Sequence, residues 1–109
     1  MRRGDVFALA VSGDYGKPRP AVIIQSDGFP DHHPSSVVCQ MTSRLVDAPT
    51  YRVTVEPDLG NGLRNRSQIM EDKPVTIRRE RIGQAIGHLS AADMARLNTA
   101  LAFVVGLAD

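Results

Sequence analysis

Short apolar stretches alternate with turn-forming residues over most of this chain. Residues 6–11 carry Val, Phe, Leu and Val at spacings typical of a β-strand. Residues 19–25 form a nearly continuous apolar run that opens with Arg19 and predicts a central strand. Residues 51–56 alternate with period two, which predicts a strand with one face in water. Further strands are predicted at residues 36–42, 68–71 and 75–77, followed by a segment with two glycines at residues 82–89.

The segments between these strands have the composition of loops. Residues 12–18, 26–35 and 57–65 are rich in Gly, Pro, Asp and Ser, which favour turns. A tighter turn is predicted at Asp72-Lys73-Pro74, between two of the short strands.

The end of the chain has a helical pattern. Ser90-Ala91-Ala92-Asp93 resembles a capping box with Asp in place of Glu or Gln, and Gly106 is a residue that ends helices. Between them, apolar residues recur at helical spacing and predict one buried face: Met94, Leu97, Leu101, Val104 and Val105. We therefore predict a mainly β fold of the α+β class, a strongly bent antiparallel sheet or small SH3-like barrel with a C-terminal helix packed on it.

Composition narrows the class of protein. A chain of 109 residues has room for one domain, so residues 1–109 are expected to form a single unit. Apolar residues make up 42% of the chain, which is too much for disorder, but no run approaches the roughly 20 apolar residues of a membrane span. Residues 6–11 are too short and wrongly flanked for a signal peptide, so we expect a soluble, cytoplasmic protein. The single cysteine, Cys39, lies in an apolar run and is interpreted as a core residue.

Charge is distributed unevenly although the net charge is only +1. Basic residues outnumber acidic ones over residues 64–81, and further arginines and a lysine punctuate the first half. Such patches can contact phosphates, but they are also common on ordinary solvated surfaces.

Common catalytic and metal-binding signatures are missing. The chain has no Walker loop, dinucleotide-binding glycine motif, nucleophile elbow, zinc-protease motif or cysteine pair. Neighbouring side chains in Asp31-His32-His33 point to opposite sides of an extended chain, so a metal site there is not expected. His88, just before the helix, is interpreted as structural. We predict neither a metal nor a cofactor.

Two strand ends carry the better candidates for chemistry. Arg19 enters a buried strand and must keep its guanidinium hydrated or paired, as an ion-pair member or an anion binder. Thr42 ends residues 36–42 and is followed by Ser43 and Arg44.

Each of these residues also has an ordinary interpretation. Asp14 and Asp72 supply carboxylates from loops that could approach the same place, either as chemical groups or as ion-pair partners of Arg19. Thr42, taken alone, is a normal β-branched strand residue.

Several short motifs, in their order and spacing, resemble the MazF/PemK family of toxin endoribonucleases over essentially the whole chain. The motifs are Arg3-Gly4-Asp5-Val6, Gly16-Lys17-Pro18-Arg19-Pro20-Ala21-Val22-Ile23, Met41-Thr42-Ser43, the run from Val75 to Gly83, Gly87-His88-Leu89 and the closing helix. One departure is Lys73-Pro74-Val75, where relatives usually have Gln, an aliphatic residue and Arg.

The resemblance implies a function and a set of site residues. Arg19 and Thr42 match the catalytic pair of the family, with Asp14 or Asp72 as the candidate general base. The implied reaction is metal-independent: the 2′-hydroxyl of single-stranded RNA attacks its own phosphate and leaves a cyclic phosphate. A homodimer and a cognate antitoxin are implied partners. RNA contacts are expected from Tyr15, whose ring would stack on a base, and from Lys17, Ser43, Arg44 and Lys73.

Two alternatives remain open at this point. A gyrase-binding toxin of the CcdB type has a related fold and would not need Arg19 and Thr42 together. A degenerate family member that only binds RNA or an antitoxin is also compatible with the departure at Lys73-Pro74-Val75.

Overall fold

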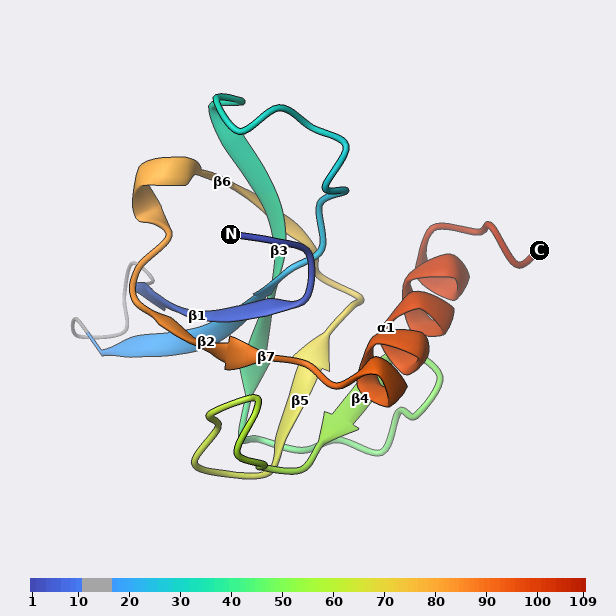
Figure 1. Ribbon diagram of the computed structural model, residues 1–109. Helices are drawn as coiled ribbons and strands as arrows, with labels where there is room; N and C mark the ends of the chain where they lie inside the picture. Colours follow the sequence, from blue (N-terminus) through green and yellow to red (C-terminus); the bar gives the residue numbers. More distant parts are fainter. Residues whose placement is uncertain (11–16) are drawn as a thin grey trace.

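A computed structural model describes residues 1–10 and 17–109 and shows one curled antiparallel sheet with a helix against one side (Figure 1). Seven strands, a short 3-10 helix and one α-helix follow one another along the chain: β1 Asp5–Ala10, β2 Pro18–Ile23, β3 Ser35–Thr42, β4 Arg52–Val55, β5 Ser67–Met70, β6 Val75–Arg78, η1 Arg79–Arg81, β7 Ala85–His88 and α1 Ala91–Val104. The predicted fold class is confirmed, and the strand ends differ from the predictions by one or two residues at most of the described ends.

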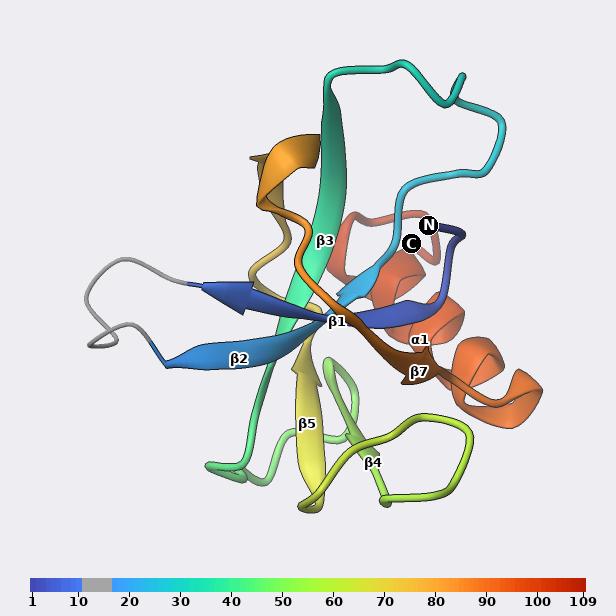
Figure 2. The same ribbon diagram turned by 60° about the vertical axis from the view of Figure 1, so that its left-hand side comes forward.

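The sheet is ordered β4-β5-β3-β2-β1-β7, and β6 also pairs with β3. Strand β3 is the longest strand and has two different partners along one side. Its first half, Ser35–Val38, pairs with β6, and its last residues, Met41 and Thr42, pair with β5. This change of partner lets the sheet curl around β3, as the two views of the ribbon show (Figure 2).

Alternation along the strands separates two apolar clusters. One cluster lies between the sheet and α1 and includes Val22, Cys39 and Leu97. The other lies on the opposite face and includes Ala21 and Val38, one residue away from members of the first cluster. Both faces of the central strands are therefore buried, which explains their nearly continuous apolar sequence.

Cys39 is fully buried, as predicted, and burial raises the pKa of its thiol to about 12. A thiol in this environment remains protonated and packs as a small apolar group.

Helix α1 begins as the capping pattern predicts. The Ser90 hydroxyl oxygen accepts the backbone N–H of Asp93 at 3.1 Å, and Gly106, with φ of 79°, follows the end of the helix. The buried face differs in part from the prediction, because Ala100 is buried beside Leu97 whereas Val105 is 62% exposed. Helix α1 ends at Val104, so Val105 no longer follows the helical spacing.

His88 has a structural role in the sheet. Its Nδ1 atom lies 2.7 Å from Oδ1 of Asp5, and Asp5 and His88 are cross-strand partners in β1 and β7. Among the described residues, no helix is long and apolar enough to cross a membrane.

Candidate functional site

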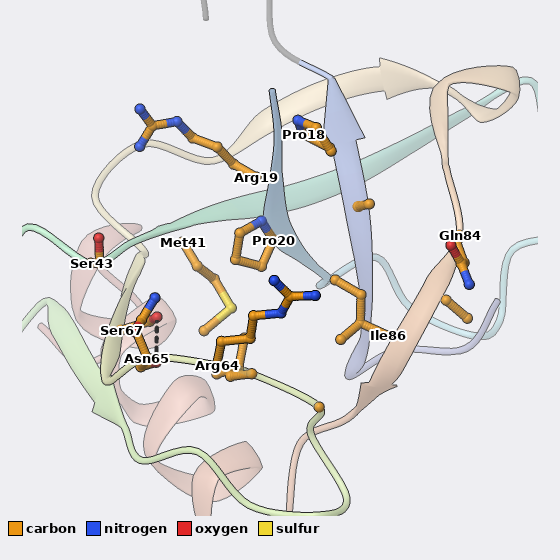
Figure 3. Close-up of a pocket in the computed structure, with 14 residues that line it drawn as sticks. Pro18, Arg19, Pro20, Met41, Ser43, Arg64, Asn65, Ser67, Gln84 and Ile86 are labelled. Atoms are coloured by element: carbon orange, nitrogen blue, oxygen red, sulfur yellow. Dashed lines mark hydrogen bonds between the residues drawn. The ribbon is translucent and has the colours of Figure 1, made fainter. Parts of the chain in front are cut away.

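A groove of about 670 Å³ opens where β2, the end of β3, β7 and the loop before β5 meet (Figure 3). Its apolar wall includes Pro20, Met41 and Ile86, and its polar atoms come from side chains of several elements. These polar residues are Arg19, Ser43, Arg64, Asn65, Ser67 and Gln84. The described lining includes two arginines, Arg19 and Arg64, whose positive charges suit an anionic ligand.

Arg64 is a groove residue that the sequence analysis counted only as part of a basic stretch. It extends from the loop between β4 and β5 toward Pro20 and Ile86 (Figure 3). This loop closes on β7, because the backbone N–H of His88 donates to the Gly60 carbonyl at 2.9 Å. Gly62, with φ of 68°, turns the chain where a Cβ atom would collide with Ile86. The glycines at 60 and 62 predicted a turn, but nothing local predicted that it would cover β7.

Arg19 and Thr42 stand at adjacent strand ends. Strands β2 and β3 pair antiparallel with Ala21 opposite Gln40, and two residues further along each strand are Arg19 and Thr42. Because side chains alternate, Arg19 shares a face with Ala21, and Thr42 shares that same face with Gln40. Arg19 is exposed and lines the groove. Thr42 is half-buried and does not line the groove itself, but its neighbours Met41 and Ser43 do.

The Thr42 hydroxyl has a defined orientation. Its oxygen accepts the backbone N–H of Arg44 at 3.0 Å. A hydroxyl that accepts one hydrogen bond still has its own proton to donate. Thr42 can therefore donate to an oxygen of a bound anion on the face that it shares with Arg19.

Asp72 has a different partner from the one that the sequence suggested. Its carboxylate accepts hydrogen bonds from Nε of Arg52 at 2.7 Å and from Nη2 at 3.2 Å. This guanidinium lowers the pKa of Asp72 below its usual value. Asp72 is therefore held in an ion pair in the turn between β5 and β6.

The remaining candidates divide by position. Ser43 lines the groove beside Arg19, while Lys17 and Arg44 are exposed next to the two strand ends. Lys73 lies with Asp72 in the β5–β6 turn and does not line the groove. Asp14 and Tyr15 lie outside the described residues.

Glu71 is a buried carboxylic acid that the sequence analysis treated only as the end of a strand. It is fully buried; its Oε1 atom accepts the backbone N–H of Val53 at 3.1 Å, and its Oε2 atom has no hydrogen-bond partner among the described residues. Burial raises the pKa of Glu71 to about 7, and the neighbouring Asp72 adds to the shift. The position of Glu71 at the end of a predicted strand was the only sequence signal.

The histidines offer no metal centre. His33 contacts the backbone carbonyl of Ser35 through Nδ1 at 3.0 Å and packs edge-on against Phe29. Over residues 1–10 and 17–109, no group of three His, Cys, Asp or Glu side chains is arranged to hold a metal ion.

Comparisons with known proteins point to one family. Residues 2–105 match the model of the PemK-like, MazF-like toxins of type II toxin-antitoxin systems. The chain is 41% identical over 109 residues to a probable endoribonuclease MazF of Mycolicibacterium smegmatis, covering 99% of each protein. It is 32% identical over 113 residues to an endoribonuclease MazF of Staphylococcus saprophyticus, covering 98% of this chain and 92% of the relative.

The fold has close counterparts among solved structures. One is a mycobacterial endoribonuclease solved in complex with its cognate antitoxin, with a TM-score of 0.84 and 24% sequence identity, covering 98% of this chain and 96% of that one. At this level of identity the similarity establishes the fold. The family match favours a MazF-type toxin over the alternative of a gyrase-binding one.

Proposed function

The chain belongs to the family of PemK-like, MazF-like toxins of type II toxin-antitoxin systems, and from this premise we propose that it is an endoribonuclease that cleaves single-stranded RNA. One observation carries the assignment of the site. The Arg19 guanidinium, which lines the groove, and the oriented Thr42 hydroxyl share one face at two adjacent strand ends. A groove lined by the two arginines Arg19 and Arg64 suits a polyanionic strand.

The chemistry follows from where charge develops. The 2′-hydroxyl of one nucleotide gives its proton to a general base and attacks the adjacent phosphorus. The bond to the 5′-oxygen of the next nucleotide breaks, and that oxygen takes up a proton from water, so that a 2′,3′-cyclic phosphate and a 5′-hydroxyl result. The nucleophile belongs to the substrate, so the protein has to hold the phosphate and stabilise its negative charge. The Arg19 guanidinium supplies the fixed positive charge and the Thr42 hydroxyl donates to a phosphoryl oxygen.

A general base for the 2′-hydroxyl is the remaining requirement. Asp72 is poorly suited because Arg52 holds its carboxylate and lowers its pKa. We therefore assign the base to Asp14, five residues before Arg19 in the sequence. Ser43, Arg44 and Lys17 are assigned to RNA contacts on the basis of their positions beside the two strand ends, and Tyr15 to base stacking.

The proposal includes partners and location. A cognate antitoxin would neutralise the activity, by analogy with the mycobacterial endoribonuclease that was solved in complex with its own antitoxin. A second copy of the chain would complete the RNA-binding surface, and analytical ultracentrifugation tests whether the protein is a dimer. As an endoribonuclease acting on single-stranded RNA, it would work in the cytoplasm.

The test compares matched substitutions on an unstructured RNA of known sequence. Arg19→Ala and Thr42→Val should each lower the cleavage rate by about a hundredfold to a thousandfold, the usual effect of removing a donor to a developing oxyanion. Arg78→Ala and Thr76→Val are the controls, because both residues are exposed on β6 and neither lines the groove. They should leave the rate within about twofold, and a chelator should not change it.

Mapping the cut ends identifies the chemistry and the recognised sequence. We expect 2′,3′-cyclic phosphate ends at a limited set of sites. Intact RNA after incubation with pure wild-type protein would instead favour a degenerate binding protein, and full activity of Arg19→Ala would refute the site.

A further inference from the structure

The loop that follows Thr42 is held to the sheet by one side chain, Gln68. Gln68 is 4% exposed and lies in β5 between two strands, with Thr42 opposite it in β3 and Thr54 opposite it in β4. Directly opposite residues of antiparallel strands place their side chains on the same face. The Gln68 amide therefore lies on the face that carries the Thr42 hydroxyl.

The amide of Gln68 pairs with the backbone of Val46 in both directions. Its Oε1 atom accepts the Val46 N–H at 3.0 Å, and its Nε2 atom donates to the Val46 carbonyl at 2.8 Å. A second bond from Nε2 reaches the Thr54 hydroxyl oxygen at 3.2 Å. The Gln68 amide thus makes the same pair of hydrogen bonds to Val46 that a residue of a neighbouring β-strand would make, and Val46 lies in the loop that follows β3.

The same loop contains the group that orients the Thr42 hydroxyl. The Arg44 N–H donates to Thr42 Oγ1, and Arg44 lies two residues before Val46. Residues 43–47 are exposed, and the two bonds between Gln68 and Val46 tie them to β5. Because an exposed loop gains little from packing, these two bonds contribute strongly to where the Arg44 N–H lies.

We propose that Gln68 is a positioning residue for the catalytic Thr42, which it orients through Val46 and the Arg44 N–H. This inference rests on the proposed ribonuclease function. Without the pair of bonds to Val46, the Arg44 N–H leaves the hydroxyl oxygen for part of the time, and the hydroxyl then samples other rotamers. Misplacement of a catalytic group by about 1 Å can cost about a hundredfold in rate.

The position also explains why glutamine, a polar residue, is buried in a strand beside Ile69. Each polar atom of its amide has a partner, so burial carries no unpaired donor or acceptor. An apolar residue of similar length would pack as well but could not hold the loop. Loss of the amide should therefore lower kcat more than it changes KM.

The experiment measures kcat and KM on a short single-stranded RNA containing one mapped cut site, using the full chain. Gln68→Met removes the amide while keeping the length of the side chain, and should lower kcat about tenfold to a hundredfold with KM within about twofold. Thr54→Val is the matched control, since it removes only the third bond of the amide. It should leave kcat within about twofold.

A double-mutant cycle with Thr42→Val distinguishes positioning from general loosening of the fold. If Gln68 acts through Thr42, then Gln68→Met adds no further loss of kcat in a protein that already carries Thr42→Val. Single-turnover rates with excess protein give access to the slow variants. Val46→Pro is a second variant in case Gln68→Met does not fold. It removes the N–H from the exposed side of the same contact without changing a core residue, and it should also lower kcat.

The outcomes separate the two proposals. Normal kcat in both Gln68→Met and Val46→Pro, additive losses in the cycle, or an equal loss in Thr54→Val would each overturn the role of Gln68. Full activity of Thr42→Val would instead contradict the proposed active site itself.

Discussion

Replacing the buried Glu71 by glutamine should remove a pH dependence of stability that the wild-type protein has near neutrality. The Glu71 carboxyl is fully buried, and its Oε2 atom has no partner among the described residues. Burial raises its pKa from 4.5 to about 7, with a smaller contribution from the negative charge of Asp72; Arg52 and the Val53 N–H act in the opposite direction. Between about pH 4.5 and pH 7 the folded protein therefore keeps a proton on Glu71 that the unfolded chain releases.

The sign and size of the effect follow from that difference. A group with a raised pKa in the folded state contributes its full stabilisation below the pKa of the unfolded chain and loses it as the pH rises through the pKa of the folded state. The free energy of unfolding should fall between about pH 4.5 and pH 7 and then level off. At 1.36 kcal/mol per pKa unit, the total change from this group is about 3 kcal/mol.

The assay is urea unfolding of wild-type protein and Glu71→Gln at a series of pH values from 4 to about 8.5. Glutamine keeps an acceptor for the Val53 N–H and does not titrate. The difference between the two proteins isolates Glu71, because all other titrating groups are shared. It should shift in favour of Glu71→Gln by about 3 kcal/mol as the pH rises through this range.

The control is the same chemical change at Glu56, which is exposed and pairs with Arg66. Glu56→Gln should leave the slope of stability against pH close to that of the wild type. If the profile of Glu71→Gln runs parallel to the wild-type profile over the whole range, the reasoning about the buried carboxyl is wrong.

Two further predictions test the turn after β5 and the contact of β7. Asp72→Asn should destabilise the protein by about 1–3 kcal/mol at neutral pH, because it weakens a partly buried pair with Arg52. The difference in unfolding free energy between Asp72→Asn and the wild type should shrink as the pH falls through the lowered pKa of Asp72. We expect kcat to stay within a few-fold of the wild-type value. Loss of RNA cleavage without loss of stability would restore Asp72 as the base. Gly87→Ala should lower the melting temperature, because its Cβ atom would collide with the backbone of Gly60 and Asn61, at a cost of about 1–3 kcal/mol. Gly28→Ala, where the added carbon meets only the Ser26 side chain, is the control, and equal melting temperatures for the two variants would contradict the close contact.

Local sequence was enough for most of the strands, for the helix and for part of the candidate site, but it did not predict η1 or identify β7 as a strand. Apolar runs and period-two alternation predicted the strands, and the capping pattern at Ser90 predicted the start of α1, because both depend on residues within a few positions of one another. Arg19 and Thr42 were recognisable in the same way, as polar residues at the ends of buried strands. The resemblance to a family then assigned them a shared role.

The partners of several polar side chains could not be predicted from local sequence, because those partners are residues far away in the sequence. Asp72 pairs with Arg52, twenty residues earlier, and Gln68 holds Val46, twenty-two residues earlier. Arg64 lines the groove only because its loop closes against β7, and Glu71 titrates near neutrality only because neighbouring strands bury it. Strand periodicity in the sequence predicts which face of the sheet a side chain occupies. Register, sheet curvature and loop closure determine which other residues contact that face, and these depend on the tertiary structure.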